Sequence, residues 1–223
     1  KLPSISLENV EECFRAFAYF DEIQDAWSKY LICGGFPIAI KEFLSYGEIS
    51  SETFDVYIDW LRGDLIKMKR SVEKFRKVVS IILQKIPSAF SLYSVSKDLD
   101  IKSHAMVSNY IDLLSQLFIV KVLYYINPND LNISFSKNRK VVFLDPFYFR
   151  LFNRWFFSPI PEESVIVENV LASHIARKFE AYYWKNDREI DVVVRSGNNL
   201  IGFESKYSSK PEVREIKVGK LKK

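Results

Sequence analysis

The stretch EIDVVVRSGNNLIGFESKY, residues 189–207, decides the fold of the C-terminal part of this sequence. Two apolar segments flank a Gly-Asn-Asn turn, and this pattern predicts two antiparallel strands joined as a hairpin. Because side chains alternate between the two faces of a strand, we expect Asp191 and Val193 to share one face. Glu204 and Lys206 share a face of the next strand, so three charged side chains are expected to meet on an otherwise apolar sheet.

A cluster of this kind suits phosphodiester hydrolysis. The helix predicted at 163–178 precedes the strands and adds Glu168. Carboxylate oxygens bind hard cations such as Mg²⁺, and the bound metal polarises a phosphoryl oxygen and helps to form hydroxide. Lys206 would position or activate the attacking water. The alternative is a cross-strand salt bridge between Lys206 and Asp191 or Glu204, without catalysis.

The pattern of Asp191 followed by Glu204-Ser205-Lys206 resembles the PD-(D/E)XK nucleases. That family also places a glutamate on the helix before its first motif strand, where Glu168 lies. The resemblance implies Asp191, Glu204 and Lys206 as catalytic residues, and Glu168, Asp191 and Glu204 as ligands of Mg²⁺.

The middle of the chain predicts a winged helix-turn-helix. Helices are expected at 71–86, around 94–99 and at 103–117, followed by strands at 118–124 and 140–144. The helix at 103–117 contains no Lys or Arg, which favours contact with a nucleic-acid backbone over base readout, and a protein-docking winged helix is the alternative. The candidate nucleic-acid-binding residues are Lys97, Lys102, Lys121, Lys137, Arg139 and Lys140.

A wider resemblance covers nearly the whole chain. The segments YLICGGFP, KVVFLDPFYFRLF, VENVLASHI, YYWKNDREIDVVV and FESKY occur in an order similar to the C-terminal half of a prokaryotic, mostly archaeal, family of AAA+-type ATPases. The resemblance implies an α+β fold in three parts: a lid-like helical linker at 1–69, the winged helix at 70–158, and a small PD-(D/E)XK-like α/β domain at 159–223.

The sequence has no G-x-x-x-x-G-K-[ST] motif and no starting methionine. We therefore expect it to be part of a longer protein, in which ATP binds to a preceding P-loop domain. The chain ends 17 residues after Lys206, so the nuclease-like domain is expected to be truncated at its edge. The expected function is binding of nucleic acid, most simply DNA, with Mg²⁺-dependent hydrolysis. The alternative is a non-catalytic regulatory or protein-interaction region.

Charge and composition add context. Residues 1–60 carry 4 basic and 11 acidic side chains, whereas residues 61–125 carry 11 basic and 5 acidic ones, which suggests separate surfaces with separate partners. The cysteines, Cys13 and Cys33, lie in apolar contexts and are expected to be reduced thiols in a cytoplasmic protein. No apolar run is long enough for a membrane span. The aromatic run 155–157 is expected to pack internally, with a patch for a homo-oligomer as the alternative.

Overall fold

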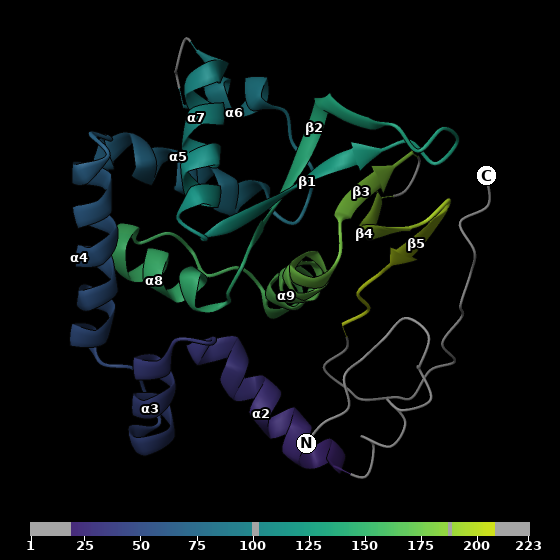
Figure 1. Cartoon of the computed structure of the whole chain (residues 1–223). Helices are drawn as coiled ribbons and strands as arrows, with labels where there is room; N and C mark the ends of the chain where they lie inside the picture. The colour runs from purple at the N-terminus through teal and green to yellow at the C-terminus, as the bar shows by residue number, and fades with distance from the viewer. Residues whose placement is uncertain (1–18, 100–102, 187–188, 208–223) are drawn as a thin grey trace.

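The computed structural model describes residues 19–99, 103–186 and 189–207, which form an α+β fold (Figure 1). Within these ranges the helices are α2 (Phe20–Cys33), α3 (Pro37–Tyr46), α4 (Ser51–Lys67), α5 (Val72–Lys85), α6 (Leu92–Asp98), α7 (His104–Gln116), α8 (Phe147–Phe156) and α9 (Glu163–Lys178). The strands are β1 (Val120–Ile126), β2 (Ile133–Phe143), β3 (Ala181–Lys185), β4 (Glu189–Ser196) and β5 (Asn199–Phe203). No helix in the described part is both long and apolar enough to cross a membrane.

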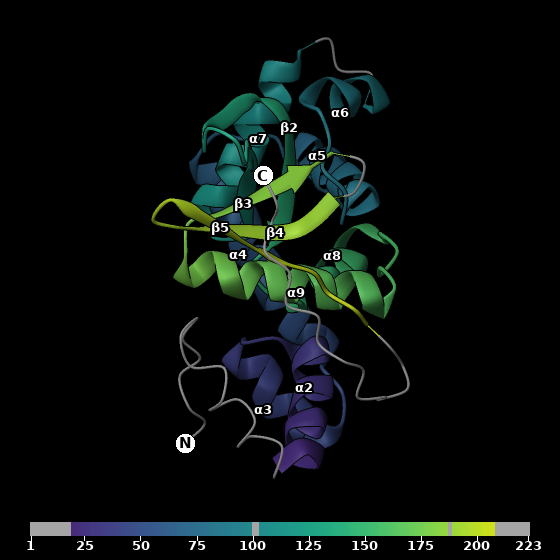
Figure 2. The ribbon, with the colours of Figure 1, turned by 90° about the vertical axis from the view of Figure 1, so that its right-hand side faces the viewer.

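The N-terminal helices α2 and α4 pack against α8, and α3 packs against α2, around a core that includes Phe147 and Leu151. Helices α2 and α3 lie at the lower end of the molecule in Figure 2. The GGFP turn between α2 and α3 explains the contact with α8. Gly34 has φ +60°, and a Cβ there would lie 1.8 Å from Asp145 Oδ1. Asp145 accepts hydrogen bonds from the backbone N–H groups of Gly35 and Phe147, so one carboxylate joins the turn to the start of α8.

Helices α5, α6 and α7 share one core with β1, β2 and α8. Ser71 and Ser91 cap α5 and α6 through their hydroxyl groups, and Ser103 stands at the N-cap position of α7. The hairpin of β1 and β2 follows α7 directly. Phe90, between α5 and α6, forms a backbone bridge with Arg139 of β2, which ties the helices to the hairpin.

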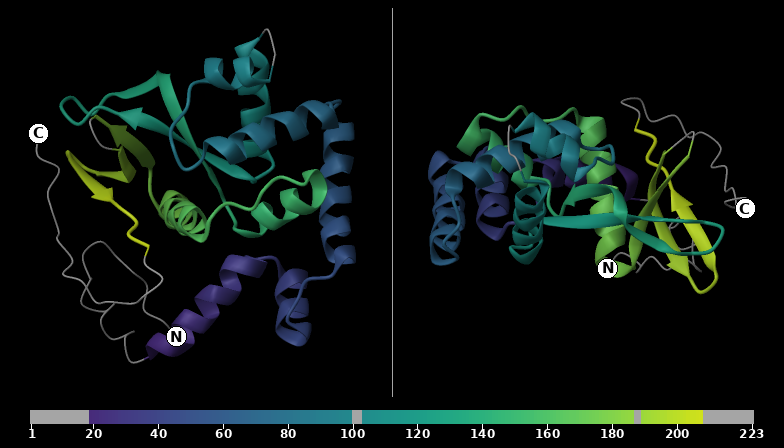
Figure 3. Two further views of the ribbon diagram at one scale, coloured as in Figure 1. Left: turned by 180° about the vertical axis from the view of Figure 1, so that it is seen from behind. Right: turned by 90° about the horizontal axis from the view of Figure 1, so that it is seen from above.

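The five strands form one sheet in the order β2-β1-β3-β4-β5. β1 and β3 pair in parallel at Tyr125 and Tyr183, and all other pairs are antiparallel. The sheet therefore crosses the boundary expected at 158/159, because β1 and β2 come before it and β3–β5 after it. Helix α9 packs against β2 and β4 (Figure 3). The core on this face combines the small Ala172 and Ala176 and the β-branched Val192 with the larger Leu123 and Tyr183.

Two strands differ from their expected lengths, and both differences affect the site. β2 begins at Ile133, so the polar residues 136–140, expected partly as a loop, lie within this strand. β5 ends at Phe203, so Glu204 and Lys206 lie beyond the sheet ladder and not on a strand. Of the aromatic run, Phe156 is buried and Phe157 is 84% exposed, at the left-handed end of α8.

Candidate functional site

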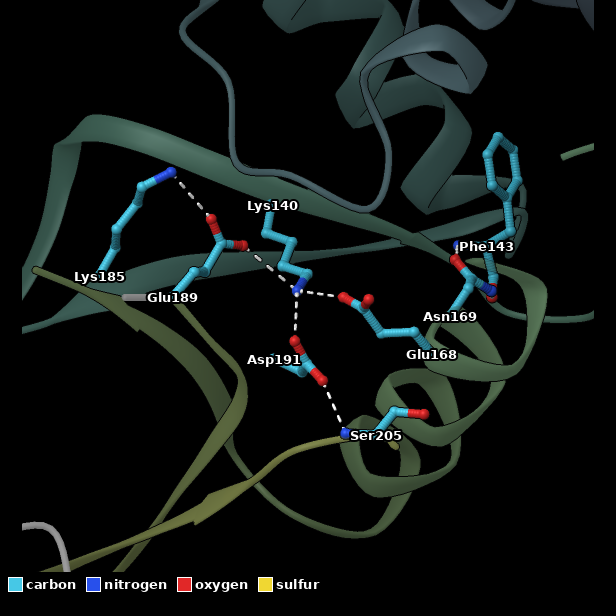
Figure 4. A network of polar contacts seen from close by, with 8 residues as sticks. All are labelled: Lys140, Phe143, Glu168, Asn169, Lys185, Glu189, Asp191 and Ser205. Atoms are coloured by element: carbon cyan, nitrogen blue, oxygen red, sulfur yellow. Dashed lines mark hydrogen bonds and ion pairs between the residues drawn. The ribbon is translucent and has the colours of Figure 1, made fainter. Parts of the chain in front are cut away.

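A buried lysine surrounded by carboxylates lies between α9 and the sheet (Figure 4). The ammonium of Lys140, on β2, is 2.8 Å from Glu168 Oε1, 3.3 Å from Glu189 Oε1 and 3.9 Å from Asp191 Oδ1. The Lys140 side chain is 2% exposed, whereas the three carboxylates are 17–18% exposed. Four charged groups from β2, α9 and β4 therefore share one poorly solvated place.

The sheet places Lys140 there through strand alternation. On β2, Val142 packs toward α9, while Val141 and Phe143 pack into the core with α5–α7. Lys140 has the parity of Val142 and so faces α9. On α9, the neighbour of Glu168 is Asn169, whose amide group is hydrogen-bonded to both the N–H and the C=O of Phe143 at 2.8 Å. This pairing fixes the position of α9 along β2.

A β-bulge places Asp191 on the same face. The ladder between β3 and β4 shifts after Tyr182, so Asp191 and Val192 together oppose one residue of β3. Val192 consequently packs under α9, and Val193 packs in the core on the other side of the sheet. The expectation that Asp191 and Val193 share a face was wrong, because the bulge adds one residue to the alternation between them.

The same bulge accounts for the positions of Glu204 and Lys206. Val192 pairs with Phe203, which also packs under α9, so the next residue, Glu204, faces away. It is Ser205 that meets the cluster, where its N–H donates to Asp191 Oδ2 at 2.7 Å. Glu204 and Lys206 instead form an ion pair with each other at 2.9 Å, with side chains 44% and 82% exposed. The structure brings Glu168 and Asp191 together and leaves Glu204 and Lys206 outside.

Burial and charge oppose one another at Glu168. Burial raises the pKa of this carboxyl above its usual value, the ammonium of Lys140 lowers it, and the nearby carboxylate of Asp191 raises it again. A second lysine, Lys185, is 3.2 Å from Glu189 Oε2 at the solvent side. The three carboxylates thus have two ammonium partners, one buried and one half exposed.

The arrangement does not fit the Mg²⁺ site that the sequence suggested. Lys140 Nζ lies at the point where a cation shared by Glu168 and Asp191 would lie, and Glu204 faces another direction. Among residues 19–99, 103–186 and 189–207, no three His, Cys, Asp or Glu side chains are grouped so that they could hold a metal ion. The chemistry of the cluster is therefore charge neutralisation by ammonium groups.

The structure separates the candidate nucleic-acid-binding residues. Lys97 on α6 and Lys121 on β1 are exposed, and Lys102 lies outside the described residues. Lys137 and Arg139 lie over the rings of Tyr125 and Tyr124 in the hairpin. The prediction that Lys140 contacts nucleic acid was wrong, because its side chain is buried in ion pairs and does not reach a phosphate at the surface.

Two residues of the cluster, Lys140 and Glu189, were not predicted as its members. The available signal for Lys140 was its position directly before the apolar run VVFL. Glu189 carried a weaker signal, because only one apolar residue follows it before Asp191. The other polar junction, around Asp145, has its own electrostatics. Burial is the main reason that the pKa of Asp145 is raised and that the pKa values of Tyr30 and Tyr148 are raised to about 12.

Comparison with known families gives two matches. Residues 24–154 match a family model described as a domain of unknown function (DUF8612), and the chain belongs to this family because the match covers more than half of it. Residues 162–222 match a second model, also described as a domain of unknown function (DUF4143). The curated proteins and the solved structures give no match.

Proposed function

We propose that this chain is the nucleic-acid-binding region of an AAA+-type ATPase and acts in the cytoplasm. The observation that carries the proposal is the order of elements along the chain, in which α5, α6 and α7 are followed by the β1–β2 hairpin. The backbone bridge between Phe90 and Arg139 joins these helices to the hairpin. Three helices followed by such a hairpin have the order of a winged helix-turn-helix, a class that binds DNA. Domains matched by the second model commonly follow AAA ATPase domains, which supports a preceding P-loop domain as partner and as the site of ATP binding.

In this proposal the PD-(D/E)XK-like part, residues 159–223, is a scaffold that does not cleave nucleic acid. The support is the position of Lys140, whose ammonium fills the space among Glu168, Glu189 and Asp191. A buried ammonium neutralises the carboxylates that would otherwise attract a divalent cation. The role of this part would then be to extend the sheet and hold the hairpin in place through the pairing of β3 with β1.

Mg²⁺-dependent phosphodiester hydrolysis is the second candidate. The observation in its favour is that Glu168 and Asp191, which the sequence motif singles out, do meet at one poorly solvated place. The two candidates differ in a single measurable property, which is cleavage of the bound nucleic acid.

The test uses the full chain and fluorescently labelled single-stranded, duplex and branched DNA. We expect binding that weakens as the salt concentration rises, because contacts to phosphate release counterions. We expect no cleavage after addition of Mg²⁺ or Mn²⁺. Cleavage that is lost in Asp191→Asn and retained in Asp59→Asn, an exposed carboxylate of α4, would establish the hydrolytic candidate instead.

A chain that binds none of these nucleic acids would contradict the proposal. The function would then be protein interaction, with the helices α5–α7 docking onto the ATPase domain or onto a second copy of the chain. Light scattering of the chain with and without the preceding domain separates these two partners.

A further inference from the structure

The edge strand β2 leaves its ladder with β1 for four residues. Tyr124 pairs with Arg139 and the next residue, Tyr125, pairs with Ser134, so residues 135–138 have no counterpart on β1. This excursion is held in place from behind, because Tyr183 of β3 donates a hydrogen bond to the carbonyl oxygen of Asn138. Bulges of this kind redirect side chains at the edge of a sheet.

The excursion presents an exposed aromatic ring with one cation on the same face of the hairpin and a second cation on the opposite face. Phe135 is 63% exposed and rests edge-to-face on Tyr124, with ring centroids 4.8 Å apart. The Arg139 guanidinium lies 5.6 Å from the centroid of the same Tyr124 ring and contacts the carbonyl oxygen of Phe135 at 3.5 Å. On the other face of the hairpin, the ammonium of Lys137 lies 3.6 Å from the centroid of Tyr125.

We propose that this excursion, residues 134–139, binds single-stranded nucleic acid, with an unpaired base stacked on Phe135 and its phosphates held by Lys137 and Arg139. The proposal rests on the proposed function and specifies its substrate class. Proteins bind single strands with little sequence preference by combining an exposed aromatic ring with nearby cations that follow the backbone, since every base has a face for stacking.

Helix α7 argues against a duplex as the preferred ligand. This helix contains no Lys or Arg, and it bears the exposed Asp112 one turn after Ser108. Ser108 is the residue of α7 that contacts the Arg139 guanidinium, at 3.5 Å. A duplex seated against α7 would bring its phosphates toward the Asp112 carboxylate, whereas a single strand can follow the hairpin and avoid it.

The geometry of the edge also argues against a peptide that adds a strand to β2. Strand addition needs a regular row of free backbone groups, and residues 135–138 depart from the register of the sheet. The side chains at this edge are an exposed aromatic ring, an exposed ammonium and a half-buried guanidinium, which match the bases and phosphates of a nucleic acid.

The experiment measures binding of the full chain to labelled oligo-dT, oligo-U and a duplex of equal length by fluorescence anisotropy. We expect the single strands to bind more tightly than the duplex, and Phe135→Ala to weaken single-strand binding about tenfold. The matched control is Tyr46→Ala. Tyr46 is 79% exposed at the end of α3, far from the hairpin (Figure 2), and its removal is expected to leave binding unchanged.

Two further variants separate stacking from charge. Arg139→Lys keeps the charge and removes the planar group over Tyr124, so we expect weaker binding with an unchanged salt dependence. Lys137→Ala removes one phosphate contact, and we expect the slope of log K against log salt to fall by about 0.7 for the single strand. Oligo-dT and oligo-U distinguish DNA from RNA as the ligand.

The outcomes are distinct. Equal single-strand binding by Phe135→Ala and the unaltered chain, or tighter binding of the duplex, overturns this inference and leaves the proposed function standing. Loss of binding to every nucleic acid in the unaltered chain overturns both. Unfolding midpoints of the variants, expected to equal that of the unaltered chain because Phe135 is exposed, show that each variant is folded.

Discussion

Two lysines lie beside carboxylates in this molecule, one inside the sheet and one beyond its last strand. Lys140 is 2% exposed and has three carboxylates within 4 Å, whereas Lys206 is 82% exposed and pairs with Glu204 at 2.9 Å. Each ammonium has a carboxylate oxygen at a similar distance, 2.8 Å for Lys140 and 2.9 Å for Lys206. The two sites therefore differ in their exposure to solvent and not in the length of the ion pair. Burial makes each charge of the Lys140 cluster costly unless it is paired, whereas solvent screens the pair at the end of β5.

The role of a charged residue in this molecule therefore depends more on its position relative to the sheet than on the motif in which it occurs. The Glu-x-Lys motif lies where β5 has ended, and its side chains turn outward after Phe203. Lys140 lies outside that motif, yet the packing of α9 and β4 around β2 leaves its side chain 2% exposed. If this account is right, substitutions in the two regions will differ greatly in their effect on stability.

The largest effect is expected from Lys140→Met. The change keeps much of the side-chain volume but leaves three poorly solvated carboxylates without their shared cation, so we expect a loss of about 3–5 kcal/mol in the free energy of unfolding. Urea denaturation monitored by tryptophan fluorescence measures it. Lys121→Met, at an exposed position of β1, is the control and should change stability by less than about 0.5 kcal/mol.

A loss of less than about 1 kcal/mol in the free energy of unfolding of Lys140→Met would contradict the claim that burial distinguishes Lys140 from Lys206. It would mean that the carboxylates reach solvent or protonate freely without the lysine. Binding of Mg²⁺ by the variant, detected as stabilisation by the added metal, would support a specific role for Lys140. The lysine would then be the group that excludes a divalent cation from the cluster.

Much of the fold could be predicted from the sequence. Helix α9 has the predicted bounds, and serine hydroxyl groups cap the starts of α5 and α6. These features depend on local rules of periodicity and capping, which the residues themselves carry. The α+β class follows from the same local patterns.

The parts that could not be predicted depend on contacts between distant segments. The parallel pairing of β1 with β3 joins the two hairpins into one sheet, and no local pattern encodes it. Glu168 and Asp191, which the sequence placed in one cluster, both lie within 4 Å of Lys140, and their role as metal ligands stays a prediction. The bulge at Asp191 shifted the alternation by one residue, so Glu204 and Lys206 lie outside the cluster, while Lys140 enters it from β2 through the alternation of that strand.

The next effect concerns Glu168→Gln, which keeps the shape of the side chain and removes its charge. We expect a loss of about 1–2 kcal/mol at pH 7, because the charge-assisted hydrogen bond to Lys140 at 2.8 Å is weakened. The difference in the free energy of unfolding between the unaltered chain and this variant should widen on acidification. Because the pKa of Glu168 is raised in the folded state, this carboxyl takes up its proton before the unfolded one does.

The sign follows from linkage. The contribution of a group with a raised folded pKa is fully present below the unfolded value of 4.5 and is lost as the pH rises through the folded value. The free energy of unfolding of the unaltered chain should therefore rise relative to that of Glu168→Gln as the pH falls from 7 to 5. Urea denaturation at both pH values measures this difference. A difference that narrows on acidification would mean that Lys140 outweighs burial at this carboxyl.

The smallest effect is expected from Glu204→Gln, in the exposed region of the comparison. The Glu204 side chain is 44% exposed and its partner is 82% exposed, so the ion pair is screened and the change should alter the free energy of unfolding by less than about 0.5 kcal/mol. The same denaturation experiment measures it, beside Lys140→Met. A loss above about 1 kcal/mol would show that Glu204 turns inward toward Asp191, and the motif at the end of β5 would then belong to the cluster after all.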